Sequence, residues 1–152
     1  MKCFQASNWV KKGALKVLSP PIRLCKNWTI LVPHQRVLIL EPSRELADKS
    51  RNLLERERYE VEIVLNLKSA ENIIRERRMS LIIVDLDLEE ISGVEAVKRI
   101  RRLDKTVPII AIHSQDSEEV SEALYLIENI SYLKKPVEFE DIFERIKEIL
   151  PR

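Results

Sequence analysis

The chain of 152 residues is 45% hydrophobic and 34% charged, which is typical of one globular domain with a single core. Its formal net charge of +1 divides unevenly, because residues 1–35 carry six basic and no acidic side chains, whereas residues 36–152 carry 20 basic and 25 acidic ones. The acidic larger part, without an evident basic patch, argues against a nucleic acid ligand; no apolar run is long enough for a membrane span, and two glycines are too few for a glycine-rich phosphate loop.

Residues 1–35 show no sustained hydrophobic period and contain the Pro20-Pro21 pair, so they predict a weakly ordered, basic N-terminal extension. Two interpretations stay open. The lack of acidic residues is typical of a transit peptide, whereas translation that begins near Val32 would make the segment foreign to the native protein. Both cysteines, Cys3 and Cys25, lie here and predict no disulfide in the core.

From residue 36 the chain alternates five times between a short apolar run and a segment with helical spacing of apolar residues. The expected strands are 37–40, 61–65, 81–85, 109–112 and 130–133; the expected helices begin after Ser43 and at Ser69, and then cover 94–103, 117–128 and about 138–151. Ser43 is a predicted N-cap, and the first helix should bury Leu46, Leu53 and Leu54.

Five such units joined by right-handed crossovers predict an α/β fold: a five-stranded, doubly wound parallel sheet in the order 2-1-3-4-5, which is the flavodoxin-like (βα)5 arrangement. The runs 81–84 and 109–112 are continuously apolar, so their strands should be central. Ligands bind beyond the carboxyl ends of such strands, at the switch point between strands 1 and 3. Those two strands end in Glu41 and Asp85.

The strand ends place acidic, basic and hydrogen-bonding residues on one rim, namely Glu41, Asp85, His113, Ser114 and Lys135. Carboxylates suit Mg²⁺, Asp85 can attack phosphorus as a nucleophile, and Lys135 can neutralise charge on phosphoryl oxygens. A cis Lys135–Pro136 bond would aim the lysine into the site, and residue 113 or 114 can bond an attached phosphoryl group. The alternatives are that Asp85 only caps the next element and that His113 is a loop residue without a role.

A set of motifs occurs in a characteristic order. It consists of Val37-Leu-Ile-Leu-Glu41, Asp85 with Gly93 eight positions later, the run from Glu95 to Arg101, Pro108-Ile-Ile-Ala-Ile, and Tyr132-Leu-Lys-Lys-Pro. In this combination residues 36–152 resemble the receiver domain of two-component response regulators. The resemblance implies that Asp85 is the phosphoacceptor and Lys135 the family's invariant lysine.

The resemblance also assigns metal and switch residues. It implies a weakly bound Mg²⁺ on Glu41, Asp85 and the backbone carbonyl of Asp87. His113, Ser114 and Tyr132 would then form the switch that responds to phosphorylation. For Tyr132 an alternative stays open, which is a half-buried strand residue packed on the fourth helix.

The function implied by the resemblance is signalling rather than enzymatic. We expect a stand-alone cytoplasmic receiver, phosphorylated by a histidine kinase or a phosphotransfer protein. It would act on a downstream protein through the face of the fourth helix, fifth strand and fifth helix, where receivers also form homodimers. No nucleic acid or membrane contact is expected of this domain.

Three residues depart from the family's pattern. Receivers usually end strand 1 with two adjacent acids, whereas here Pro42 replaces the second; His113 stands where a threonine or serine is expected, and Glu89 where a proline is expected. Pro42 and His113 favour an alternative, a pseudo-receiver that binds partners without phosphorylation. A remote third interpretation is a haloacid-dehalogenase-like phosphatase, which the Asp85-Leu-Asp87 motif resembles, although Glu89 does not fit that motif either.

Overall fold

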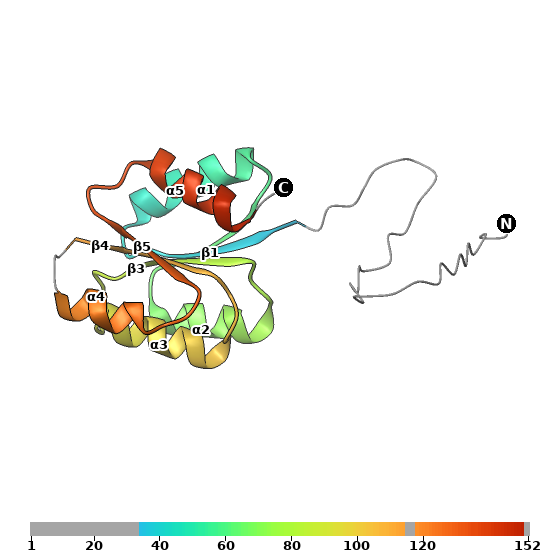
Figure 1. Ribbon diagram of the computed structural model, residues 1–152. Helices are drawn as coiled ribbons and strands as arrows, with labels where there is room; N and C mark the ends of the chain where they lie inside the picture. The colour runs from blue at the N-terminus through green and yellow to red at the C-terminus, as the bar shows by residue number, and fades with distance from the viewer. Residues whose placement is uncertain (1–33, 115–117, 151–152) are drawn as a thin grey trace, which may run out of the picture. The chain divides into compact units, whose positions relative to one another are not determined.

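The computed structural model describes residues 34–114 and 118–150, so the predictions for residues 1–33 lie outside this range. Strands and helices alternate along the described chain (Figure 1). They are β1 (Arg36–Leu40), α1 (Arg44–Arg56), β2 (Glu60–Val64), α2 (Leu67–Glu76), β3 (Leu81–Asp85), α3 (Gly93–Leu103), β4 (Ile109–His113), α4 (Glu118–Tyr125), β5 (Ile130–Lys134) and α5 (Phe139–Ile149). None of the described helices is both long and apolar enough to cross a bilayer.

The five strands form one parallel sheet in the order β2-β1-β3-β4-β5, which confirms the predicted topology. Figure 1 shows α1 and α5 on one face of the sheet and α2, α3 and α4 on the other. β3 and β4 are buried along their whole length because each lies between two strands and under helices on both faces. The parallel register aligns Asp85 with Ile112, so the central strands finish at a common rim.

Alternation along the strands divides the core into two clusters. Ile82 and Val84 of β3 pack in the cluster that includes residues of α2, α3 and α4, whereas Leu81 and Ile83 pack in the cluster that includes residues of α1 and α5. Asp85 continues the alternation of Leu81 and Ile83. Its carboxylate is therefore expected on the α1/α5 side of the rim, at the end of a fully buried strand.

α1 begins after Ser43 as predicted, whereas the start of α2 and the buried face of α1 differ from the prediction. α2 begins at Leu67 rather than at Ser69, because the Asn66 side chain accepts a hydrogen bond from the Ser69 N–H at 2.9 Å and thereby caps the helix two residues earlier. Ser43 does occupy the N-cap position of α1, but its side chain makes no capping bond. The prediction that Leu46 is buried is wrong: it is 49% exposed, because the buried stripe of α1 runs through Ala47 and Leu54.

α4 is shorter than predicted. It ends at Tyr125 rather than at Glu128, because the chain turns after Leu124 and Asn129 adopts a positive φ of 58° before β5 begins. Leu124 is 1% exposed and packs in the core, while the next two residues, Tyr125 and Leu126, lie on the surface. α4 therefore ends one residue after Leu124, which is the last residue of this helix in the core.

Gly93 begins α3 under a close contact with the chain that follows β3. A methyl group at this position would lie 2.5 Å from both the Cβ and the carbonyl oxygen of Leu86. Leu86 is buried and its N–H donates to the Ile112 carbonyl, so the Leu86 backbone cannot move away without disturbing this hydrogen bond and the surrounding packing. The glycine allows α3 to start directly beneath the rim that carries Asp85.

Gly93→Ala is expected to lower the free energy of unfolding by about 1–3 kcal/mol, because the added methyl overpacks the Leu86 backbone. Urea denaturation measures the change. Ser92→Ala is the matched control, since the Ser92 side chain makes no capping bond and is exposed. Equal stabilities for the two variants would contradict this account of the close contact.

Candidate functional site

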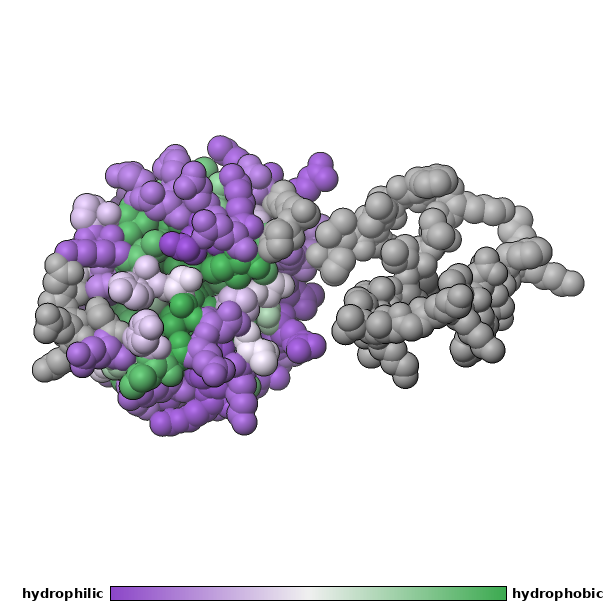
Figure 2. Space-filling model, in the orientation of Figure 1, coloured by the Kyte–Doolittle hydropathy of each residue, from purple (hydrophilic) through white to green (hydrophobic). Residues whose placement is uncertain are grey.

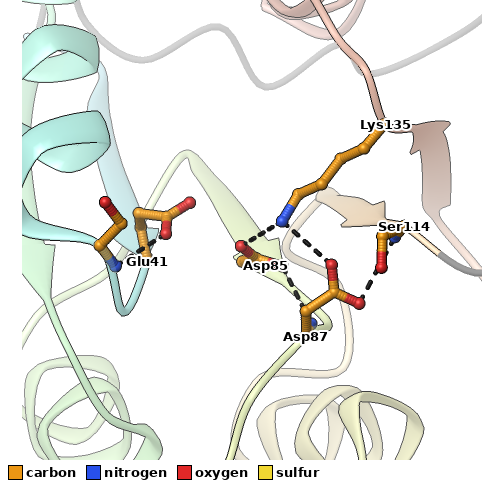
Figure 3. A network of polar contacts seen from close by, with 6 residues as sticks. Glu41, Asp85, Asp87, Ser114 and Lys135 are labelled. Carbon is orange, nitrogen blue, oxygen red and sulfur yellow. Dashed lines mark hydrogen bonds and ion pairs between the residues drawn. The ribbon is translucent and has the colours of Figure 1, made fainter.

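The carboxyl ends of four strands bring the predicted polar residues to one rim. Glu41 follows β1, Asp85 ends β3, His113 ends β4 and Lys135 follows β5. Figure 3 shows Lys135 reaching across the rim to Asp85 and Asp87. The register of the parallel sheet, rather than proximity in sequence, thus assembles the site.

Asp85 has both carboxylate oxygens engaged. Oδ2 accepts a hydrogen bond from Lys135 Nζ at 2.7 Å, and Oδ1 accepts one from the backbone N–H of Asp87 at 2.9 Å. The residue is 4% exposed. These two bonds fix the orientation of the carboxylate, and they also show that Asp85 does more than cap the following turn.

Lys135 bridges two carboxylates. Its Nζ donates to Asp85 Oδ2 and, at 3.0 Å, to Asp87 Oδ2, and its backbone N–H donates to the His113 carbonyl at 2.7 Å. The Lys135–Pro136 peptide bond is cis, as predicted. Burial lowers the pKa of Lys135, but the hydrogen bonds to Asp85 and Asp87 outweigh it and raise the pKa above its ordinary value, so the ammonium stays charged at neutral pH.

The Asp87 side chain is a site residue that sequence reasoning missed, since only its backbone carbonyl was expected to act. Its Oδ2 accepts from Lys135, and its Oδ1 accepts from the Ser114 N–H at 3.4 Å. Burial raises the pKa of Asp87, but hydrogen bonds from Lys135 and Ser114 outweigh it and lower the pKa overall. The signal was the spacing of two residues after Asp85, which places the side chain on the turn that leaves the strand.

Glu41 stands apart from this network, on the other side of Asp85 from Lys135 in Figure 3. Its Oε1 accepts a hydrogen bond from the Ser43 N–H at 2.9 Å. Burial raises the pKa of Glu41, the Ser43 bond lowers it, and the negative charge of Asp85 raises it further, so that the pKa lies above its ordinary value. Two carboxylates therefore repel each other across the rim.

The predicted switch residues lie beside the site but differ in exposure. The His113 side chain is buried, and its ring centroid lies 5.8 Å from that of Tyr132, which is 48% exposed on β5. Ser114 is exposed and donates to Asp87 through both its side chain and its backbone N–H. Tyr132 thus packs beside His113 at the edge of the sheet formed by β5, where apolar surface shows among polar side chains (Figure 2), and its switching role stays a prediction.

The oxygen atoms on the rim are candidate ligands for Mg²⁺. The described residues hold no group of three or more His, Cys, Asp or Glu side chains placed to bind a metal. A smaller set of ligands is still enough for Mg²⁺, because this ion often keeps several waters and needs only one or two carboxylates from the protein. Glu41 and Asp85 supply two carboxylates whose mutual repulsion a cation would relieve, and the carbonyl of Asp87 supplies the third oxygen.

Comparison with known proteins identifies the family. The model of the response regulator receiver domain matches residues 37–147. The chain belongs to this family. The receiver is 31% identical over 114 residues to the uncharacterized transcriptional regulatory protein YkoG of Bacillus subtilis, a match that covers 75% of the chain and 50% of YkoG. It is 25% identical over 117 residues to the transcriptional regulatory protein TctD of Salmonella typhimurium, covering 77% of the chain and 52% of TctD.

Solved receiver structures share the fold. The CheY-like receiver domain protein of Methanospirillum hungatei is 28% identical with a TM-score of 0.70, over 76% of this chain and 92% of that one. Chemotaxis protein CheY4 of Vibrio cholerae has a TM-score of 0.70 at 24% identity, over 77% of this chain and 99% of that one. The chain spans about half the length of the curated relatives it matches. Family membership, together with the position of Asp85 on the third strand, sets the phosphatase interpretation aside.

A cavity of about 440 Å³ opens beside the receiver's acidic site, with apolar walls from α1 and α5. Asp85, Glu41 and Lys135 contribute to its lining, and so does Leu46 of α1. This position accounts for the exposure of Leu46, which faces the cavity instead of the core. It also gives the nearly buried Asp85 carboxylate a route to solvent.

Glu41→Gln is expected to raise the free energy of unfolding at neutral pH by less than about 1 kcal/mol, because the amide removes a charge that burial and Asp85 disfavour in the folded state. A carboxyl whose pKa is raised by folding loses stability as the pH rises through that pKa. The gain should therefore shrink as the pH falls and Glu41 itself binds a proton.

Urea denaturation at neutral pH and at about pH 4 tests this dependence. Glu122→Gln, which changes an exposed carboxylate on α4, is the control and should have little effect at either pH. A gain that is the same at both pH values would contradict the electrostatic cause.

Proposed function

We propose that Asp85 accepts a phosphoryl group from a phosphohistidine of a histidine kinase or phosphotransfer protein, in a step that depends on Mg²⁺. The observation that carries the proposal is the ion pair of 2.7 Å between Asp85 and Lys135, both of which line a cavity that opens to solvent. A carboxylate that is fixed, ionisable and paired with a lysine at a strand end is suited to phosphoryl transfer.

The transfer exchanges one bond for another. An Asp85 carboxylate oxygen forms a bond to phosphorus while the bond from phosphorus to the donor's imidazole nitrogen breaks, and the imidazole keeps the electron pair. Lys135 remains an ammonium because its pKa is raised, so it can pair with the phosphoryl oxygens. Glu41, Asp85 and the Asp87 carbonyl would hold Mg²⁺, which neutralises charge on the phosphoryl group when bound.

The signal would leave through the loop after β4. The Ser114 N–H donates to Asp87 over 3.4 Å, which is a long bond that a phosphoryl oxygen can replace. Movement of this loop would alter α4, β5 and α5, where Tyr132 lies beside His113. A downstream protein that binds this face would then distinguish the two states. The receiver is also expected to act alone, to pair with a second copy and to work in the cytoplasm, and these three points stay predictions.

A second candidate function is favoured by Pro42. This residue follows Glu41 where receivers usually have a second acid, and it offers no side-chain oxygen to a metal. A pseudo-receiver would keep the fold and the Lys135 network, and would bind its partner without phosphorylation. In that case the ion pair between Asp85 and Lys135 would be purely structural.

Acetyl phosphate with Mg²⁺ is expected to add the mass of one phosphoryl group to the protein, and beryllofluoride with Mg²⁺ should shift the amide NMR signals of the loop after β4. Both effects should vanish in Asp85→Ala and persist in Asp48→Ala, which changes an exposed aspartate on α1. They should also weaken when Mg²⁺ is chelated. An unmodified wild-type protein would favour the pseudo-receiver.

Leu46→Asp is expected to slow phosphoryl transfer from a phosphohistidine protein about tenfold, because a protein donor must approach past this exposed apolar residue to reach Asp85. Labelling by acetyl phosphate should be unchanged, since a small donor needs no apolar contact. Rapid-quench kinetics with both donors measures the difference. Equal slowing with both donors would indicate damage to the site rather than loss of a docking contact.

A further inference from the structure

A second cavity lies away from the acidic site, between α3 and the turn that connects α4 to β5. It measures about 470 Å³, and its lining is mostly basic and apolar: Lys98, Arg101, Arg102, Lys105, Leu126, Ile127 and Glu128. We call it the basic groove. It corrects the expectation that residues 36–152 form no basic patch. Part of the signal was present in the sequence, because Lys98, Arg101 and Arg102 follow helical spacing on α3, and Lys105 comes two residues after the end of this helix.

The floor of the basic groove is fixed by Arg101. Its guanidinium donates to the backbone carbonyls of Asp104, Val107 and Asn129, at 3.2, 2.7 and 3.3 Å. These bonds tie the end of α3 to the turn before β5, so the groove is a preformed feature rather than a gap between mobile side chains. Arg101 itself is committed to this structural role.

The other basic side chains are available to a partner. Lys98 and Lys105 are exposed and form no salt bridge within the described residues, 34–114 and 118–150. Arg102 contacts Glu95 at 3.6 Å, but both side chains are exposed, so water screens this pair. The groove therefore presents positive charge that the chain itself leaves largely uncompensated.

Apolar surface adjoins this charge. Tyr125 and Leu126 are 86% and 83% exposed, well above the other exposed large hydrophobic side chains of the described chain. They are consecutive, and Leu126 lines the groove. Adjacent aromatic and aliphatic side chains at the edge of a charged groove are typical of a protein-binding surface.

We propose that the basic groove binds an acidic peptide segment of a partner protein that also carries a large apolar side chain. Charge complementarity selects carboxylates for Lys98, Arg102 and Lys105, and Leu126 selects the apolar residue. Nucleic acid would match the charge but would leave the leucine without an apolar contact. The acidic side chain of Glu128 in the lining also disfavours a uniformly anionic membrane surface.

The basic groove and Asp85 lie at opposite ends of the sheet. The Asn129 carbonyl, which accepts from Arg101, also accepts from the N–H of Ile109 at the start of β4. Asp85 and Lys135 instead lie at the carboxyl ends of the strands. A peptide in the groove would thus leave the acidic site accessible, and the two sites can be tested separately.

A library of random peptides displayed on phage tests the proposal on the full chain. Selected sequences should be rich in aspartate and glutamate around a leucine or an aromatic residue. The strongest selected peptide, labelled with fluorescein, should bind about tenfold more weakly to Lys98→Glu/Lys105→Glu and to Leu126→Ser, and more weakly as salt is added, as fluorescence anisotropy would show. Lys68→Glu, which reverses an exposed lysine on α2, should bind like the wild type.

Circular dichroism of each variant checks that the fold is intact, and acetyl phosphate labelling should be unchanged in all of them. Selected peptides that are neutral or basic, no selection at all, or equal binding by Lys98→Glu/Lys105→Glu would overturn the proposal. Tighter binding of duplex DNA through Lys98 and Lys105, or self-association that is lost in Leu126→Ser, would replace the acidic peptide with another occupant and overturn it as well.

Discussion

The short ion pair between Lys135 and Asp85 is the contact on which the rest of the site depends. It joins the ends of β5 and β3, which are separated by β4, and therefore exists only if the parallel sheet has its correct order. Because the same ammonium also binds Asp87, one lysine holds the turn after β3 and places two carboxylates beside a single positive charge. A change in the charge on Asp85 would alter the hydrogen bond from Lys135 to Asp87, and through Asp87 the hydrogen bond from Ser114.

Much of the fold was predictable because hydrophobic pattern and strand ends are local signals. The continuous apolar runs before Asp85 and His113 predicted the two central strands, and alternation with helices predicted the strand order. Glu41, Asp85 and Lys135 reached the predicted rim because parallel strands must end together. The position of the rim depends only on which segments are strands and on the order of these strands. An error of a residue or two at a strand boundary therefore does not change it.

What could not be predicted depends on three-dimensional detail. Leu46 fits the apolar spacing of α1, but only the packing shows that Ala47 occupies the buried position and that Leu46 faces a cavity. α2 begins two residues before its predicted start at Ser69 because the Asn66 side chain accepts a hydrogen bond from the Ser69 N–H, a contact that the apolar pattern does not reveal. The Asp87 carboxylate and the groove around Arg101 involve partners far away in sequence, which periodicity does not reveal.

The alternation of side chains in β3 has a further consequence for the two faces of the sheet. Asp85 belongs by position to the α1/α5 side, where the cavity lies, whereas Ser114, which donates to Asp87, precedes α4 on the opposite side of the sheet. The cavity at Asp85 and the contact of Ser114 with Asp87 therefore lie toward different faces of the sheet, although α5 contributes both to the cavity and to the proposed output face. Under the proposed function, a donor at the cavity is compatible with a partner that binds α4 alone, whereas a partner that covers Phe139 and Ile142 of α5 would compete with the donor.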